Sequence, residues 1–313
     1  MDDPKVLAAS LQNAGVILRG QGRLDEAMEK LEEALEIFLK LHGKEHADTA
    51  GTLSLIGSIH EGRGEHDLAL GQLGEALGIL LRTLGPDHVH VAGTFSNIAE
   101  VHESQGRYDE ALKCLDETLR IHKERHGDEH EHVASTLNNI AGVRSNQGRQ
   151  AEALEGYQEA LRIFKMRLGD EHPDVAIVLS NIGAKHRKQG RDAEALACSR
   201  EALRIMRKTM GHTNPRVGGV HIQVALSLLD LGESDEALEH IEKALEIQSE
   251  AFGKESNEVA WVKFGMAGAY RMQGSRRMAR GLFRESARIF ALVHGPEHAY
   301  TLDAIEQEGQ DGA

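Results

Sequence analysis

The 313-residue sequence has few aromatic residues and few prolines, and it lacks any long run of apolar residues. Aromatic residues make up 4% of the chain and prolines number five, whereas alanine, leucine, glutamate and glycine are plentiful. Sheets are rich in aromatic and β-branched residues, and proline inside a helix breaks it. The composition therefore predicts an all-α protein.

The missing apolar runs and the charge exclude two kinds of partner. A membrane-spanning helix needs about 18 or more consecutive apolar residues, and no stretch of the chain approaches that length. The first residues, Met1–Leu7, carry neither the basic flank nor the apolar run of a signal peptide. A net charge of −14 opposes binding to nucleic acid or to anionic lipid. We therefore expect a cytoplasmic protein that binds neither nucleic acid nor membranes.

Glycine recurs at a fixed interval of 42 residues, in two series that lie 21 residues apart. Glycine ends helices because it alone enters the left-handed conformation without steric cost, so each unit should hold two helices. One series is Gly43, Gly85, Gly127, Gly169, Gly211, Gly253 and Gly295, and the other is Gly22, Gly64, Gly106, Gly148, Gly190, Gly232 and Gly274.

This period predicts a single right-handed α-solenoid over residues 1–313, built of stacked antiparallel helix pairs. In the third repeat, apolar spacing predicts a first helix from near His88 to Ser104 and a second from near Tyr108 toward Arg125. The seven repeats cover 1–42, 43–84, 85–126, 127–168, 169–210, 211–252 and 253–294, and a capping helix lies in 295–313.

Small residues hold three fixed positions in each repeat, and they would let paired helices approach closely. Seven residues before each mid-repeat glycine stands glycine or alanine, and five residues after it stands alanine every time. Seven residues after that alanine stands alanine, threonine or serine. Cys114 and Cys198 also share one repeat position, in repeats that are not neighbours, so we expect free thiols.

The small-residue pattern resembles the tetratricopeptide signature. The strings at Asn139–Val143, Gln147–Leu154 and Ala160–His172 further resemble the 42-residue repeats of kinesin light chains, and the resemblance covers nearly the whole chain. It implies a protein-binding scaffold or cargo adaptor rather than an enzyme. The resemblance also implies that the first helices build the concave wall where a partner's extended segment binds.

The eighteen histidines are the main candidates for chemistry, notably the pairs His88-Val-His90 and His130-Glu-His132. Five of them, His46, His88, His130, His172 and His298, fall at one repeat position, three residues after a boundary glycine, which predicts a structural role at helix entry. Further metal ligands would have to come from neighbouring junctions, about 10–20 Å away. No phosphate-binding loop or nucleophile signature occurs. We therefore predict no catalytic residue, no metal site and no cofactor.

Asparagine recurs on the inferred concave wall. Asn97, Asn139 and Asn181 share one position and match the groove asparagine of the family, with Asn138 beside them. An amide both donates and accepts hydrogen bonds, which suits recognition of a peptide backbone. Hydrogen bonding between helices inside the solenoid is the alternative interpretation.

Charge and apolar side chains vary along the same wall. It is acidic at Glu61, Glu100 and Glu103, and it becomes basic at Arg187, Lys188 and Arg271. The repeats 169–210 and 253–294 are the only ones with net positive charge, which predicts protein or peptide partners with acidic segments. Trp261 and Phe264 add an apolar strip, which is either an exposed docking site or buried by tighter curling of the superhelix.

Two rival functions remain open at this stage, and the oligomeric state is not predicted. The chain could be an oligomerisation or sensor module of a larger signalling protein, since it begins at a repeat boundary and ends in a lone first helix. It could also be a metal-dependent enzyme that uses the junction histidines. Light scattering tests the first rival, and metal analysis of the purified protein tests the second.

We predict that deleting the terminal helix, near His298 to Glu308, lowers solubility. That helix should cover the apolar edge of the last repeat, as caps do in solenoids. The measurement compares the soluble fraction and light scattering of the full chain with those of a chain that ends at Gly295. Equal solubility of the two proteins would contradict a capping role.

Overall fold

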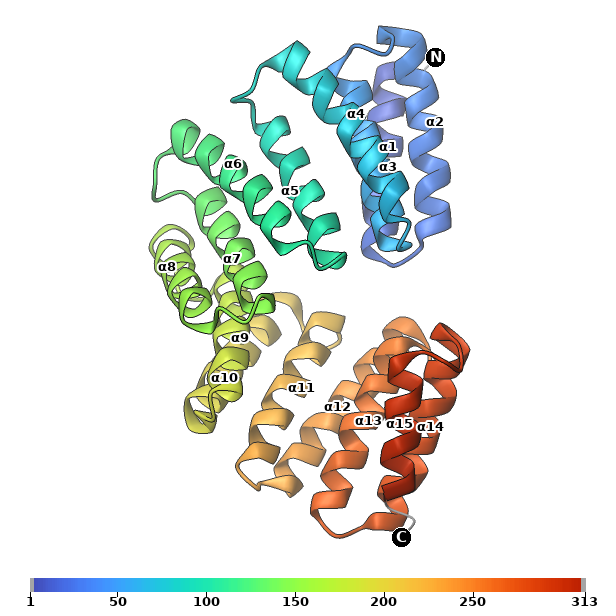
Figure 1. The fold of residues 1–313 in the computed structure, drawn as a ribbon, viewed down its shortest axis with the longest axis vertical. Coiled ribbons are helices and arrows are strands. Elements are labelled where there is room, and N and C mark those ends of the chain that lie inside the picture. Colours follow the sequence, from blue (N-terminus) through green and yellow to red (C-terminus); the bar gives the residue numbers. More distant parts are fainter. Residues whose placement is uncertain (1–2, 311–313) are drawn as a thin grey trace. The chain divides into compact units, whose positions relative to one another are not determined.

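A computed structural model describes residues 3–310, and every regular element within them is an α-helix. A first helix of 16 or 17 residues alternates with a second helix of 19 residues (Figure 1). The first helices are α1 (Pro4–Gly20), α3 (Ala47–Gly62), α5 (Val89–Ser104), α7 (Glu131–Asn146), α9 (Pro173–Lys188), α11 (Pro215–Asp230) and α13 (Asn257–Met272). The second helices are α2 (Leu24–His42), α4 (His66–Leu84), α6 (Tyr108–His126), α8 (Gln150–Leu168), α10 (Asp192–Met210), α12 (Ser234–Phe252) and α14 (Arg276–His294), and α15 (Ala299–Gln310) follows them.

The chain divides into two compact units within α8, between Ile163 and Phe164. The N-terminal unit holds α1 to α7 and most of α8, and the C-terminal unit holds the end of α8 and α9 to α15. That all seven repeats form one continuous solenoid stays a prediction. None of the described helices is both long enough and apolar enough to cross a membrane.

Both glycine series end helices as the sequence predicts. All fourteen glycines have positive φ angles, from 68° at Gly190 to 97° at Gly295, which other residues adopt only with strain. The helices predicted for the third repeat are confirmed, because α5 and α6 begin and end within about two residues of the expected positions.

The junction histidines cap the first helices. The Nδ1 atom of His46 accepts a hydrogen bond from the backbone N–H of Asp48 at 3.1 Å, which satisfies one of the unpaired donors at the start of α3. At the start of α11 the side chain of Asn214 does the same for Arg216 at 2.9 Å. The predicted role at helix entry is confirmed, since the same bond is made by His88, His130, His172 and His298.

Small residues bring the two helices of each pair together. A Cβ atom on Gly57 of α3 would lie 2.7 Å from Cγ of Leu73 and 3.3 Å from the backbone oxygen of Ala69, both in α4. Ala69 and Leu73 are themselves fully buried, so neither can move aside cheaply. Leu73 also packs against Val101 of α5, so the core continues from one repeat into the next.

The first helices line the inner side of each unit. In the N-terminal unit α3 contacts both α1 and α5, and in the C-terminal unit α11 contacts both α9 and α13, whereas second helices of neighbouring repeats contact one another less. A stack whose first helices lie closer together curves toward them. We call the surface of the first helices the inner wall of each unit.

The terminal helix α15 packs on the last helix pair, near the range predicted for it. Ala304 is fully buried with Ile289 and Phe290 of α14. Two other residues of α15, Leu302 and Ile305, stay about half exposed, at 49% and 51%. Cys114 and Cys198 are free thiols as predicted, and burial raises the pKa of both.

Gly57→Ala should lower the free energy of unfolding by about 1–3 kcal/mol, because the added methyl group overfills the contact with Leu73. Gly51→Ala on the same helix is the matched control, since a Cβ there meets nothing within 4 Å. It should raise the free energy of unfolding by about 0.5–1 kcal/mol through helix propensity alone. Urea unfolding followed by circular dichroism measures both, and equal effects of the two variants would refute the packing role of Gly57.

Candidate functional site

The inner wall of the N-terminal unit carries a hollow between α3 and α5. Its volume is about 210 Å³, and its floor is open because Gly51 and Gly93 offer no side chain. Asn97 stands half-buried at its edge, in the position that the sequence analysis assigns to peptide binding. We call this feature the Asn97 hollow; it is lined by Gly51, Ser54, Leu80, Val89, His90, Gly93, Thr94 and Asn97.

Three carboxylates stand on the same inner wall, nearer to the C-terminal ends of α3 and α5 than the residues of the hollow. The Ser104 hydroxyl donates to Oε1 of Glu61 at 2.9 Å, and the Asn146 amide donates to Oε1 of Glu103 at 2.8 Å, so hydrogen bonds link successive first helices. Glu100 is exposed, yet neighbouring helices flank it and displace bulk water. Burial raises the pKa of Glu100, and the neighbouring carboxylates of Glu61 and Glu103 raise it further, although Arg19 of α1 opposes the shift.

Burial also raises the pKa of Glu103, although the bond from Asn146 opposes the shift. Tyr157 of α8 is buried behind this wall, and a Cβ on Gly142 would lie 3.7 Å from its hydroxyl oxygen. Burial, with a contribution from Glu103, raises the pKa of Tyr157 to about 12. This part of the wall therefore carries negative charge in surroundings that disfavour it, so a bound cation would stabilise it.

The remaining asparagines stand on first helices of both units. Asn139 of α7 is exposed, and its side-chain oxygen accepts a hydrogen bond from the half-buried Asn138 at 3.4 Å. Asn181 of α9 is half-buried in the C-terminal unit. Their joint action as a ladder for a peptide backbone stays a prediction.

Two of the three predicted cations are already engaged within the C-terminal unit. Arg187 donates to Asp230 of the next first helix at 3.1 Å. Arg271 donates to the side-chain and backbone oxygens of Gln307 in α15, both at 2.7 Å, and its guanidinium lies 4.5 Å from the centre of the Phe283 ring. Lys188 is exposed. A partner's carboxylate would therefore have to compete with the chain's own groups for the two arginines.

The aromatic strip joins the terminal helix. Trp261 is 36% exposed, and its ring contacts those of Phe290 at 5.0 Å and Tyr300 at 4.8 Å between centroids. Phe264 is half-buried and packs against Phe283 at 5.1 Å. The aromatic strip is therefore neither fully exposed nor fully buried. The helices α14 and α15 cover part of it, and one side of Trp261 stays accessible.

A basic surface lies on α10, a second helix, and it is not among the sites predicted from the sequence. A hollow of about 350 Å³ there is lined by four cations and His212. Arg200 pairs with Glu236 at 2.6 Å and Arg204 pairs with Glu171 at 2.8 Å, whereas Arg207 donates to His212 at 3.0 Å. The signal in the sequence was a run of cations at helical spacing.

A contact between the buried His221 and the half-buried His240 is also not predicted from the sequence. The Nδ1 atoms of His221 in α11 and His240 in α12 lie 2.9 Å apart, and burial lowers the pKa of His221 to about 4. The signal was a break in the period, since His221 and His240 stand one repeat after Leu179 and Cys198. The buried Lys185 breaks the period in the same way, one repeat after Val143.

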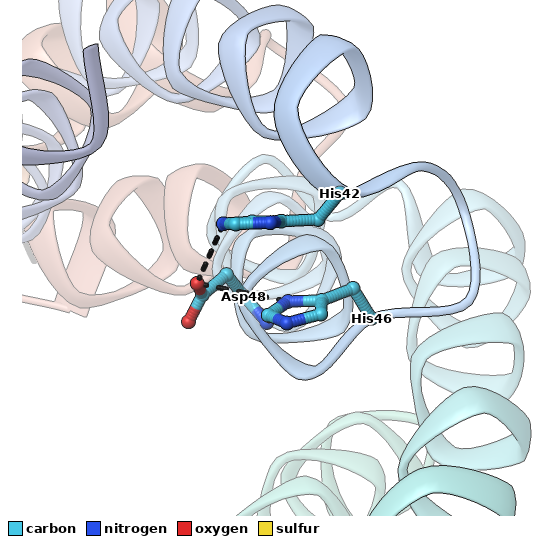
Figure 2. A group of neighbouring side chains, drawn as sticks. All are labelled: His42, His46 and Asp48. Atoms are coloured by element: carbon cyan, nitrogen blue, oxygen red, sulfur yellow. Dashed lines mark hydrogen bonds and ion pairs between the residues drawn. The ribbon is translucent and has the colours of Figure 1, made fainter.

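A third group lies at the junction between α2 and α3, where three potential metal ligands meet (Figure 2). His42, His46 and Asp48 place one ligand atom each within 4.8 Å of the others. The sequence argument that further ligands must come from neighbouring junctions is therefore wrong, because the turn at Gly43 brings His42 back over His46. Their rings stack at 4.1 Å between centroids.

The helix pairs, the glycine turns and the small-residue contacts define a tetratricopeptide repeat protein. The sequence profile of the tetratricopeptide repeat family matches residues 7–82, 90–166, 132–208 and 217–291, which together cover most of the chain. The chain therefore belongs to this family. No curated protein is similar enough in sequence to count as a match.

Solved structures show the same fold. BtubC (BKLC) from P. vanneervenii superposes with a TM-score of 0.61 at 19% identity, over 74% of this chain and 92% of that one. A variant of a putative kinesin light chain from Podosopora anserina, with nearly identical TPR-like repeats, gives a TM-score of 0.56 at 21% identity, over 66% and 97%. A Rap protein complexed with competence and sporulation factor gives a TM-score of 0.58 at 15% identity, over 98% and 99%. At these identities the similarity establishes the fold alone.

Glu100→Gln should raise the free energy of unfolding at neutral pH. A raised pKa in the folded chain means that folding disfavours the ionised carboxylate, and the neutral amide removes that cost. After allowance for solvent screening, the gain should be below about 1 kcal/mol. The gain in stability should vanish at pH values well below the ordinary glutamate pKa of 4.5, because there the wild-type carboxyl is protonated in both the folded and the unfolded chain.

Urea unfolding at neutral and at acid pH measures this difference. Glu29→Gln, at an exposed position of α2, is the control and should change stability by less than about 0.5 kcal/mol. A loss of stability in Glu100→Gln at neutral pH would show that the carboxylate is stabilised on the inner wall.

Proposed function

We propose that this protein is a scaffold that binds an extended segment of a partner protein along its inner walls. The observation that carries the proposal is the Asn97 hollow, an open recess between α3 and α5 that is lined by both polar and apolar side chains, with the crowded carboxylate of Glu100 on the same helix as Asn97. Concave surfaces of stacked helix pairs are where repeat proteins bind extended partners. The proposed role is that of a cytoplasmic adaptor of the kinesin light chain type.

The charge of the walls indicates which partner chemistry fits. A lysine or arginine of the partner would relieve the repulsion among Glu61, Glu100 and Glu103 in the N-terminal unit. An acidic segment, as predicted from the sequence, would bind at Lys188 in the C-terminal unit. The asparagine amides would hydrogen-bond the backbone between these charged residues.

A relative of the same fold supports a peptide partner. The Rap protein named above forms a complex with competence and sporulation factor. We propose that this chain uses its repeats in a comparable way, with its own partner and without catalysis.

Crosslinking mass spectrometry of the tagged chain in cell extract would identify the partner and the contact surface together. Crosslinks should lie on the first helices.

With the purified partner segment, Asn97→Ala, Asn139→Ala and Asn181→Ala should each weaken binding, because each removes hydrogen bonds worth about 0.5–1.5 kcal/mol, or about 2- to 13-fold in Kd.

Glu29→Gln on α2, outside the inner wall, is the control and should leave Kd unchanged. Unchanged affinity in all three asparagine variants, with circular dichroism showing an intact fold, would overturn the inner-wall proposal. Crosslinks confined to second helices would overturn it as well.

Self-association is a second candidate function, favoured by apolar side chains exposed on both terminal helices. Val6 and Ile17 of α1 are 60% and 61% exposed, and Leu302 and Ile305 of α15 are about half exposed. Apolar side chains gathered on a surface often mark protein contacts. Light scattering that shows a monomer at all accessible concentrations would exclude this function.

A further inference from the structure

The turn between α2 and α3 arranges three side chains as a coordination shell would (Figure 2). Nε2 of His42 lies 3.5 Å from Oδ2 of Asp48, and Nδ1 of His46 lies 3.6 Å from the same oxygen. In a tetrahedral zinc site with bonds of about 2.0–2.1 Å, ligand atoms lie about 3.3 Å apart. The two separations are close to that value before any ion is considered.

The carboxylate oxygen at the centre of this group has no hydrogen bond. Oδ2 of Asp48 is shielded from solvent, and no described residue donates to it. Besides the two imidazoles, Nζ of Lys5 lies 3.7 Å away, which is also beyond hydrogen-bond distance. The Asp48 side chain as a whole is 33% exposed, but this oxygen is shielded and lacks a donor, so a cation bound among these groups would stabilise it.

We propose that His42, His46 and Asp48 bind one divalent transition-metal ion, of which Zn²⁺ fits best. Two imidazole nitrogens and one carboxylate oxygen are a donor set that zinc accepts, whereas calcium and magnesium prefer oxygen alone. Three protein ligands leave the fourth position of a tetrahedral ion open to water or to a donor from a partner.

The ion would displace two existing contacts. Nδ1 of His46 accepts the capping bond from the N–H of Asp48 at 3.1 Å, and an ion bound to that nitrogen takes the same lone pair. Lys5 would move away, which its exposed position permits, because a surface pair of this length contributes little.

Other junctions of the chain supply matched comparisons at the same three positions. The junction between α8 and α9 keeps His172 and Asp174, with Nδ1 3.5 Å from Oδ2, but it has Leu168 where His42 stands. The junction between α6 and α7 replaces the carboxylate with His132, whose ring lies 5.4 Å from that of His126. Only the first junction, among the described residues, brings three donors within ligand range.

Loss of the site is tested with three variants that the repeats themselves suggest. His42→Leu copies Leu84 and Leu168, His46→Asn keeps the cap as Asn214 does, and Asp48→Asn removes the charge. Untagged full-length protein is titrated with Zn²⁺ by calorimetry and with Co²⁺ by visible absorption. Each variant should lose one bound equivalent, because each removes one of the three proposed ligands.

Gain of a site is the sharper test. Leu168→His completes the same set with His172 and Asp174, so this variant should bind one equivalent more than the wild type. His126→Leu is the control for the histidine junction and should leave the assigned equivalent in place. The proposal is overturned if the wild type binds no ion at submillimolar metal, or if binding survives all three loss variants and disappears in His126→Leu.

Discussion

The close approach of paired helices at small residues is the contact on which the rest of the structure depends. At Gly57 the backbone of α3 leaves no room for a methyl group beside Leu73, and Ala69 completes the contact from α4. Because the same small positions return every 42 residues, each helix pair presents nearly the same surface to the next. The curvature toward the first helices, and with it the inner wall, follows from that repetition.

Repetition also separates structural residues from functional ones. Histidine three residues after a boundary glycine caps a helix at five junctions. A histidine at this position is therefore not by itself evidence of a catalytic or metal-binding site. A metal site becomes possible where suitable residues combine at one junction: His126 and His294 are counterparts of His42, but His42 alone of the three is followed by both a capping histidine and an aspartate, Asp48. Glu100 of the inner wall is likewise particular to its repeat, since no other repeat has a carboxylate at that position.

The fold and its helix boundaries could be predicted from the sequence because glycine turns depend on local backbone geometry. The same glycine positions recur in every repeat, so each repeat gives the same evidence for its helix ends. The contacts of individual side chains could not be predicted, because their partners stand far away in the sequence. Arg271 looked available for a ligand, yet Gln307, which follows it by 36 residues, takes two of its hydrogen bonds. The grouping of His42 with Asp48 depends on the direction in which the turn at Gly43 returns the chain.

Hydrogen exchange with and without the identified partner tests the central claim, that binding occurs on the inner walls, most directly. Bound partner shields the amides and side chains it covers and slows local opening. The account predicts slower exchange in the first helices, beginning with α3 and α5 around the Asn97 hollow, and unchanged exchange in α2. Protection confined to the second helices would contradict it.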